Sequence, residues 1–179
     1  MPFIETRIPG VVIFEPRIFT DDRGYFFETY NEKVFKDAGI DACFVQDNQS
    51  KSSYGVIRGL HFQKGEHAQA KLVRVLQGAV LDVAVDLREG SATFGKHVAV
   101  ELSDVNNLQL FIPRGFAHGF SVLSKTAVFA YKCDNLYCKE SEGGISCSDP
   151  DLGIDWQIPV EEACLSEKDK ILPRLKECF

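Results

Sequence analysis

Hydrophobic and polar side chains alternate every second residue along most of the chain, and this period limits the possible folds more than any other feature. Successive side chains of a strand point to opposite faces, so a period of two indicates strands with one buried face. Gly, Pro and Asp residues interrupt the alternation about every eight to twelve residues, as turns between strands do. The sequence therefore predicts an antiparallel all-β domain with little helix.

The alternation is strong enough to place individual strands. They are predicted over residues 11–14, 25–30, 44–50, 56–63, 71–76, 79–87, 97–102, 107–112, 119–123 and 126–133. So many strands in 179 residues must curl or split into two packed sheets. After about residue 141 the alternation weakens, and an irregular segment is expected to pack against the sheets. No linker or internal repeat divides the chain, so residues 1–179 are predicted to form a single domain.

Helix signals are confined to one or two short segments. The predicted helix runs from Asn31 to Ala38, because Asn31 suits the N-cap and Gly39 suits a left-handed residue just beyond the end. A short helical turn is expected after Ser166.

Strand parity places two polar side chains on otherwise apolar faces. Lys71 shares a face with Val73 and Val75, and Tyr131 shares a face with Phe129. A cation on an apolar face is poorly solvated, whereas a strand tyrosine is most often a core aromatic with its hydroxyl bonded to backbone. Lysine can also extend its ammonium out at the end of a barrel.

Glycine complicates parity in one strand. Arg58 and His61 fall on opposite faces of a regular strand, but Gly59 lies between them. Glycine inside a strand often marks a bulge that redirects side chains. With a bulge at Gly59, both side chains are predicted to face inward.

Charge and hydropathy exclude several classes of partner. The net charge is −6 and the pI near 5.2, so a broad basic face for nucleic acid is not expected. No apolar run approaches the roughly 18 residues that cross a bilayer. The first residues show no basic segment followed by an apolar stretch, so a cytoplasmic location is predicted.

Metal and disulfide sites are disfavoured by residue spacing. The six cysteines include no C-x-x-C pair, and the spacing of Cys133, Cys138 and Cys147 matches no common zinc pattern. The four histidines include no His-x-His, although His118 remains free to meet His61 in space. The prediction is a protein without a metal, with reduced cysteines that belong to packing or surface.

Several motifs follow one another in an order that resembles the dTDP-4-dehydrorhamnose 3,5-epimerase family. The motifs are Phe19-x-Asp21-x-Arg23-Gly24-x-Phe26-x-Glu28, Gln46-Asp47-Asn48-x-Ser50, Arg58-Gly59-Leu60-His61-Phe62-Gln63 and Ile112-Pro113-x-Gly115-Phe116-Ala117-His118-Gly119-Phe120. The resemblance spans nearly the whole chain. It implies a cupin-type double-stranded β-helix, usually a homodimer, that acts without metal or redox cofactor.

The resemblance also implies a substrate and a reaction. The substrate would be a dTDP-linked 4-keto-6-deoxyhexose, inverted at C3 and C5 on the route to dTDP-L-rhamnose. Removal of a proton next to a ketone needs a base, a group that stabilises the enolate oxygen, and an acid on the opposite ring face. By resemblance His61 is the base, Asp169 orients it, Lys71 stabilises the enolate and Tyr131 is the acid. Without the resemblance, Asp169 is more typical of a residue that starts a helical turn.

The remaining site residues are also assigned by resemblance. Substrate-binding roles fall on Arg23, Glu28, Gln46, Asn48, Arg58, His118, Glu142 and Lys168, with Tyr137, Phe19 and Phe26 beside the nucleotide. Arginine suits a diphosphate because its planar fork donates two parallel hydrogen bonds. For the two phenylalanines, plain core packing is an equally good interpretation.

Three other functions stay open. Relatives that invert only one carbon of a related dTDP-4-keto-deoxysugar keep most of these motifs. A cupin that only binds a nucleotide sugar is disfavoured, because binding alone does not require a base, a cation and an acid. A metal-dependent dioxygenase is disfavoured by the missing His-x-His. Residues 1–10 are expected to pair with the partner subunit.

Overall fold

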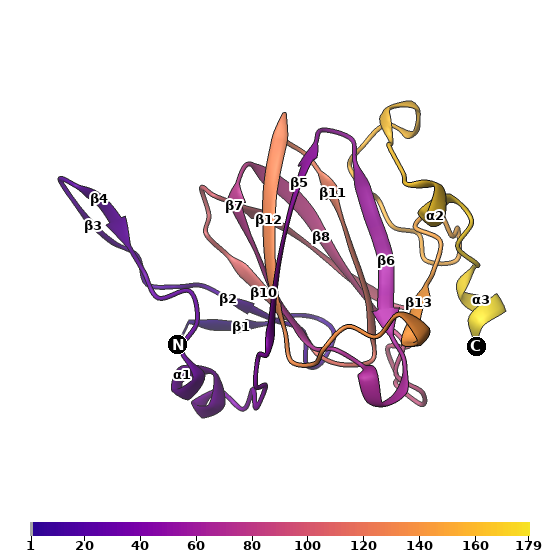
Figure 1. Cartoon of the computed structure of the whole chain (residues 1–179), viewed down its shortest axis with the longest axis horizontal. Coiled ribbons are helices and arrows are strands. Elements are labelled where there is room, and N and C mark those ends of the chain that lie inside the picture. Colours follow the sequence, from indigo (N-terminus) through magenta and orange to yellow (C-terminus); the bar gives the residue numbers. More distant parts are fainter. Residues whose placement is uncertain (1) are drawn as a thin grey trace.

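Two antiparallel sheets pack face to face in the computed structural model, which describes residues 2–179 (Figure 1). The six-stranded sheet has the order β1 (Phe3–Glu5), β2 (Val12–Phe14), β10 (Gln109–Ile112), β7 (Lys71–Gln77), β12 (Thr126–Cys133) and β5 (Gln46–Ser53). The five-stranded sheet has the order β13 (Glu142–Gly144), β6 (Ile57–Gln63), β11 (Phe116–Val122), β8 (Ala79–Asp86) and β9 (His97–Ser103). The predicted all-β, cupin-like fold is confirmed.

The main core fills the space between the sheets. Val73 and Val75 of β7 and Phe129 of β12 meet Phe120 of β11 there, and all four are buried. Phe120 and Phe129 stack with ring centroids 4.2 Å apart. Side chains two positions apart on a strand point to the same face, so the residues that alternate with these four also point into the space between the sheets.

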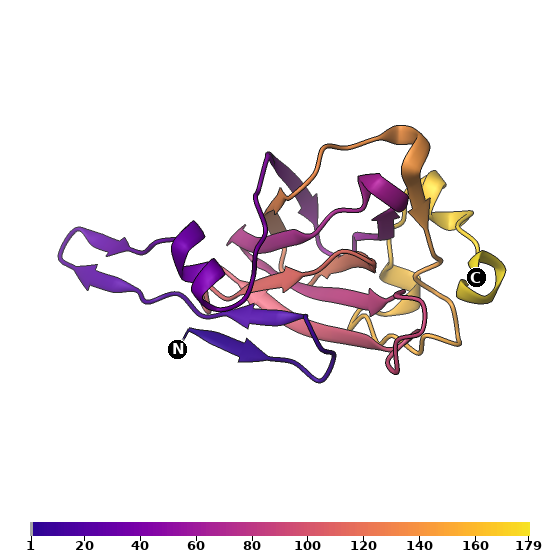
Figure 2. The ribbon, with the colours of Figure 1, turned by 90° about the horizontal axis from the view of Figure 1, so that it is seen from below.

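A hairpin projects away from both sheets. It consists of β3 (Phe19–Asp21) and β4 (Gly24–Phe26), and it extends beyond the rest of the molecule in both views (Figure 2). The predicted strand over 25–30 is confirmed only at residues 25 and 26, because β4 ends at Phe26, where its pairing partner Phe19 begins β3. No other described strand continues the pairing of β4 beyond this point.

Short helices and a long C-terminal segment complete the fold. Helix α1 (Glu32–Asp37) begins where predicted, with the Asn31 side chain accepting hydrogen bonds from the next turn. Helix α2 (Glu167–Lys170) follows Ser166 as predicted, whereas α3 (Leu175–Cys178) was not predicted. Three 3₁₀ turns lie at Gly65–His67, Lys139–Ser141 and Val160–Glu162.

The strands missed by the sequence pattern are all short. β1, β3 and β13 have three residues each, too few to establish a period of two. β1 pairs with β2 of the same chain at the edge of its sheet. Met1 lies outside the described residues, and pairing of residues 1–10 with a second chain stays a prediction.

The C-terminal segment is fixed against β6. The amide of Ile57 donates to the Cys164 carbonyl at 3.0 Å, and the Cys164 amide donates to the Gly55 carbonyl at 2.8 Å. The amide of Ser146 donates to the Pro173 carbonyl at 2.8 Å. These bonds hold the intervening helix α2 beside the strand that carries His61.

Candidate active site

A cavity of about 570 Å³ opens at one end of the space between the sheets. Its polar lining comes from β5, β6, β7, β11, β12 and the C-terminal segment, and includes Asn48, Arg58, His61, Lys71, His118, Tyr131, Tyr137, Glu142, Lys168 and Asp169. These are the four predicted catalytic residues and six of the predicted binding residues. Asn48 and Asp169, which are 121 positions apart in sequence, therefore share one cavity.

His61 and Asp169 form a close pair at the wall of this cavity. Nε2 of His61 lies 2.7 Å from Oδ1 of Asp169, which is only 4% exposed. A carboxylate accepts hydrogen bonds and cannot donate them, so Nε2 carries the proton and the other ring nitrogen is left as a base. The Asp169 amide also donates to Oγ of Ser166 at 3.1 Å. Asp169 thus both belongs to a capped helical turn and orients the imidazole.

The irregularity at Gly59 brings Arg58 into the same cavity as His61. Gly59 has a φ of +129°, and the pairing of β6 with β11 shifts register beside it. A Cβ at this position would lie 2.6 Å from Cα of Gly119. Both strands therefore need glycine where they cross, and the prediction that Arg58 and His61 both face inward is confirmed.

Lys71 and Tyr131 face each other from neighbouring strands. Nζ of Lys71 lies 5.8 Å from the centre of the Tyr131 ring. Burial lowers the pKa of the Lys71 ammonium and raises the pKa of the Tyr131 phenol. The cavity therefore holds a poorly solvated lysine beside a neutral phenol, a proton donor.

His118 is held by a second carboxylate. Both oxygens of Asp82 lie near its Nε2, at 3.1 and 2.9 Å, and both residues are buried. His118 pairs directly opposite His61 across β11 and β6. Burial lowers the pKa of His118, so its imidazole is neutral near pH 7.

A polar cluster lines the outer part of the cavity. Glu142 binds Nζ of Lys168 at 2.6 Å and accepts a hydrogen bond from the Tyr137 hydroxyl at 3.0 Å. The bond to Lys168 is the main reason that the pKa of Glu142 lies below its usual value. The amide of Tyr137 donates to the Gln46 side chain, which in turn bonds Asn48 at 3.1 Å. Five of the predicted binding residues therefore form one connected group.

The comparisons with known proteins agree with this geometry. The family model described as dTDP-4-dehydrorhamnose 3,5-epimerase matches residues 5–177. The chain belongs to the dTDP-4-dehydrorhamnose 3,5-epimerase family.

Similar proteins, two of them with solved structures, match this chain over nearly their whole length. A dTDP-4-dehydrorhamnose 3,5-epimerase from Elizabethkingia anophelis is 60% identical, with a TM-score of 0.95 over 98% of this chain and 96% of that one. A 3,5-epimerase from Legionella pneumophila, solved with dTDP-4-keto-L-rhamnose, is 50% identical, with a TM-score of 0.93 over 97% and 92%. The Methanothermobacter thermautotrophicus enzyme is 51% identical over 98% of this chain and 95% of its own.

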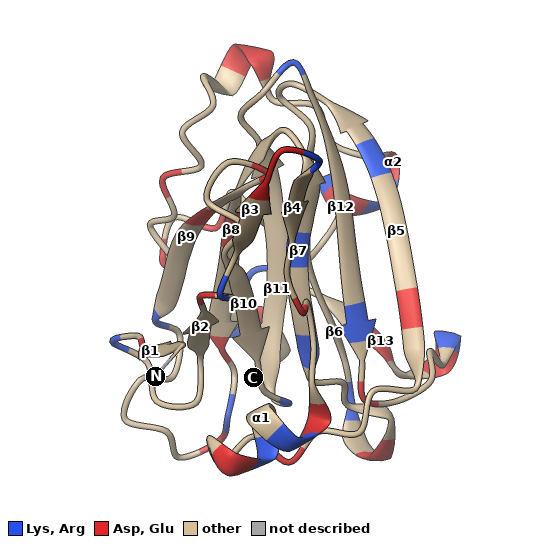
Figure 3. Cartoon of the chain, turned by 90° about the vertical axis from the view of Figure 1, so that its left-hand side faces the viewer, with Lys and Arg blue, Asp and Glu red and all other residues tan. Residues whose placement is uncertain are grey.

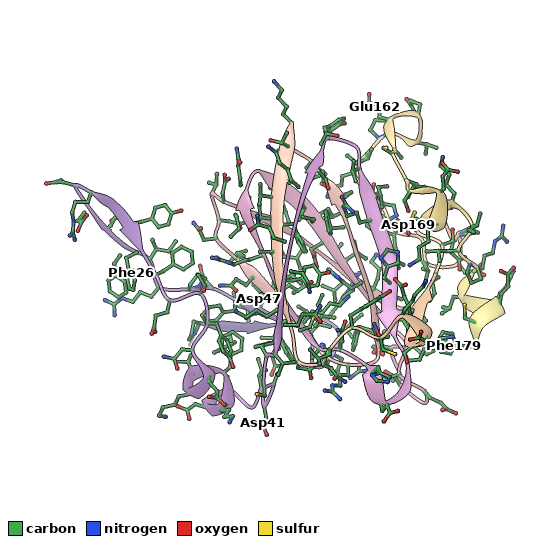
Figure 4. All side chains as sticks on the ribbon, in the orientation of Figure 1. Phe26, Asp41, Asp47, Glu162, Asp169 and Phe179 are labelled. Carbon is green, nitrogen blue, oxygen red and sulfur yellow. The ribbon has the colours of Figure 1, made fainter. Side chains whose placement is uncertain are left out.

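Five predicted binding residues of this epimerase do not line its cavity. One is Gln46, which is linked to the cavity through its bond to Asn48, and the other four lie on or just after the hairpin. Arg23 lies on the projecting hairpin, bonded to Asp21, and its side chain is 90% exposed. Phe19 and Phe26 are 50% and 68% exposed, so the alternative of core packing is wrong for both. Figure 4 shows Phe26 on the hairpin at one side of the molecule and Asp169 beside β6 at the other.

Glu28 follows the hairpin and also lies outside the cavity, where its carboxylate accepts a hydrogen bond from Asn31 at 3.3 Å. Within one chain the hairpin set of Phe19, Arg23, Phe26 and Glu28 is therefore apart from the catalytic residues, because β3 and β4 pair only with each other. Sequence order gave no indication of this separation.

Sequence reasoning also missed several residues of the epimerase site. The cavity wall includes Phe62, Gln63, Gln69, Phe120 and Phe129, and Asp82 lies behind it. Asp82 alternates with Val80 and Ala84 on β8, so the parity argument used for Lys71 would have identified it.

The assignment of Cys133 to surface or packing differences away from the catalytic set is corrected. Its thiol accepts a hydrogen bond from Asn48 at 3.7 Å, and Cys133 pairs opposite Lys71 across β12 and β7. Burial raises the pKa of this thiol to about 11, so it is neutral at physiological pH. Cys133 thus packs beside the site residues Lys71 and Asn48 without lining the cavity itself.

Two further observations concern residues 2–179 as a whole. No three His, Cys, Asp or Glu side chains in this range are grouped so that they could hold a metal ion. No helix in the same range is long and apolar enough to cross a membrane.

Acidic and basic residues are interspersed on the side that faces the viewer in Figure 3.

Proposed function

We propose that this epimerase inverts C3 and C5 of dTDP-4-keto-6-deoxy-D-glucose and so forms dTDP-4-keto-L-rhamnose. The observation that carries the proposal is the convergence of the His61–Asp169 pair, Lys71 and Tyr131 on one cavity. A protein that only binds a nucleotide sugar needs neither an oriented base nor a proton donor opposite it, so this arrangement favours an enzyme. The family membership supports the same reaction.

Each inversion follows from the roles of these side chains. His61 takes the proton from the carbon beside the ketone, and the C–H electron pair moves to the carbonyl oxygen to form an enolate. Lys71 stabilises that oxygen, because its charge is weakly screened in the cavity. The enolate then collapses, and Tyr131 gives a proton to the same carbon from the opposite face. Solvent reprotonates Tyr131 and removes the proton from His61.

Substrate binding is assigned to the remaining polar residues of the cavity. Arg58 and Lys168 supply positive charge for the diphosphate. The ring of Tyr137, fixed by its bond to Glu142, would cover the thymine. His118 would bind the hexose as a neutral imidazole.

The hairpin set would act on a second chain. Phe19, Phe26 and Arg23 are exposed on an arm that reaches away from its own cavity. Exposed aromatic rings beside a guanidinium suit a thymine and a diphosphate. We therefore propose a homodimer in which the hairpin of one chain completes the cavity of the other. A cytoplasmic location stays a prediction.

The test is incubation of the pure protein with dTDP-4-keto-6-deoxyglucose in D₂O, with deuterium located by NMR. Label at both C3 and C5 of the product is the expected result. Label at one carbon would instead identify a mono-epimerase of a related sugar. Bound substrate without any label would leave only a nucleotide-sugar binding protein, and both outcomes would contradict the proposal.

A chelator added to the same assay tests the proposed independence from metal. Full exchange in EDTA is expected, because the residues given roles supply base, acid and electrophile between them. Activity that disappears in EDTA and returns with zinc or iron would contradict this part of the proposal.

A further inference from the structure

A second histidine–carboxylate pair lies behind the cavity, and the mechanism above assigns no role to its carboxylate. Asp82 is fully buried, and both of its oxygens lie within 3.1 Å of Nε2 of His118. The carboxylate can only accept, so Nε2–H of His118 is shared between the two oxygens. Asp82 does not line the cavity. Any effect on the substrate must therefore pass through its neighbours.

The surroundings of Asp82 are apolar. Val80 and Ala84, on the same face of β8, are fully buried in the main core, and Phe120 is its pairing partner on β11. A carboxylate is stable in such a place only if a positive charge compensates it. Among residues 2–179, His118 is the only side chain that bonds Asp82, and its imidazole, neutral near pH 7, brings no compensating positive charge.

Lys71 is the cation that shares this end of the barrel. The titratable and charged groups that face it are Asp82 from β8, His118 from β11, His61 from β6, Glu142 from β13, and Cys133 and Tyr131 from β12. Burial lowers the pKa of Lys71, and the fields of Cys133, Asp82 and Glu142 raise it.

Of these groups, only Asp82 is a carboxylate without a lysine or arginine bound to it. The Cys133 thiol is neutral, because burial raises its pKa to about 11. Glu142 already binds Lys168 at 2.6 Å. Asp82 remains, and its field in a poorly screened interior opposes the loss of the Lys71 proton.

We propose that Asp82 is a positioning residue that holds His118 through Nε2 and supplies the negative charge that keeps Lys71 a cation facing the bound ketone. The inference rests on the proposed function, in which the Lys71 ammonium stabilises the enolate oxygen. Lys71 and Asp82 lie on the faces of β7 and β8 that carry Val73, Val75, Val80 and Ala84 into the main core, so both side chains point into the same interior. A neutral Lys71 would leave the enolate without its cation.

The substitution Asp82→Asn tests the charge while it keeps the shape and an acceptor for His118. The alkaline limb of the kcat profile should move to lower pH by about one unit, because an ammonium without its counter-charge loses its proton more easily. KM should change less than twofold. An unchanged profile would show that Asp82 only holds His118, and the proposal would be wrong.

Two further variants identify the group whose titration produces the alkaline limb of the kcat profile. Arginine keeps its charge throughout this range, so in a Lys71→Arg background the shift caused by Asp82→Asn should disappear. A shift that persists there would assign the limb to another group, such as Tyr131, and contradict the proposal. Asp86→Asn removes another buried carboxylate from β8, away from the cavity, and should leave the limb in place.

NMR of the wild-type protein tests the charge of Lys71 directly, even if Asp82→Asn does not fold and whether or not the protein is active. The protein is labelled with ¹³C at lysine Cε, and the Lys71 signal is identified as the one that disappears from the spectrum of Lys71→Arg. It should report an ammonium at pH 8, and a neutral amine at pH 8 would overturn the proposal. If the wild type exchanges no deuterium, the proposed function fails, while this titration still decides the charge of Lys71.

Discussion

At the scale of single residues, the two ends of the proton path are chemically distinct. His61 is a base because Asp169 holds its other nitrogen protonated, and Tyr131 is an acid because burial favours its neutral phenol. A base is needed for exchange, whereas an acid on the opposite face is needed for inversion. Variants of the two residues should therefore fail in different ways.

His61→Ala is expected to lower deuterium exchange at both C3 and C5 by about 10²- to 10⁴-fold, the usual contribution of a general base. Tyr131→Phe should slow formation of the inverted product more than it slows exchange. NMR of the sugar in D₂O measures both rates in one sample.

Matched controls separate these roles from general damage. His67→Ala and Tyr54→Phe change the same residue types outside the cavity, and both should keep wild-type rates. Full turnover in His61→Ala, or equal slowing of exchange and inversion in Tyr131→Phe, would show that the roles are assigned wrongly.

At the scale of elements, the crossing of β6 and β11 depends on glycine at Gly59. Gly59→Ala should lower the free energy of unfolding by about 1–3 kcal/mol more than Gly24→Ala does. The two glycines have nearly the same φ, +129° and +127°, but a Cβ at Gly24 meets nothing within 4 Å. Urea unfolding of both variants measures the difference. Equal losses would mean that the close approach to Gly119 is unimportant.

The end of β8 is held by Asp86, which gives stability a dependence on pH. Burial opposes ionisation of this carboxyl, but hydrogen bonds from Arg88, Thr93 and Ser91 outweigh it and hold the pKa of Asp86 well below its usual range. A lowered carboxyl pKa contributes stability that is complete above the unfolded value of about 3.9. That stability is lost as the pH falls towards the folded value.

Asp86→Asn is therefore expected to lower the free energy of unfolding by about 1–3 kcal/mol at pH 7. The difference from wild type should shrink as the pH falls below about 4, since the wild-type carboxyl is then protonated on unfolding. Urea midpoints between pH 2.5 and 7 measure this dependence, and Asp22→Asn in the exposed hairpin turn serves as the control. A difference that stays constant over this range would contradict the linkage.

At the scale of the whole molecule, the hairpin set makes the proposed dimer testable by complementation. One variant, Arg23→Ala with Glu28→Ala, lacks binding groups on the hairpin, and the other, His61→Ala, lacks the base. Both should be inactive alone. In a mixed dimer, the hairpin of the His61→Ala chain would complete the cavity of the other chain.

Co-expression of the two variants in equal amounts should restore about a quarter of wild-type activity, because half of the dimers are mixed and each has one complete cavity. Dimers purified through two different affinity tags are all mixed, so they should show about half of wild-type activity. No rescue would mean that each hairpin serves its own chain. Gel filtration that gives only monomers at assay concentration would also contradict the proposal.

The order of motifs and the period of two were enough to predict the all-β fold, the family and the cavity residues from β5 to β12. Alternation is sufficient for the all-β class, because it specifies which side of a strand is buried. The family and the cavity residues were predicted by the resemblance of the motifs. Asn31 as a helix cap and Gly59 as a bulge are local features, and both predictions are confirmed.

Tertiary structure alone decided which of these residues meet. Pairing of β6 with the C-terminal segment brings Asp169 to His61, and the barrel interior brings Asp82 within the field of Lys71. It also carries Arg23 away from the cavity to which its motif assigned it. Contacts of this kind join residues far apart along the chain. The sequence could not predict them, because the period of two specifies which face of a strand is buried but not which residue packs against that face across the core.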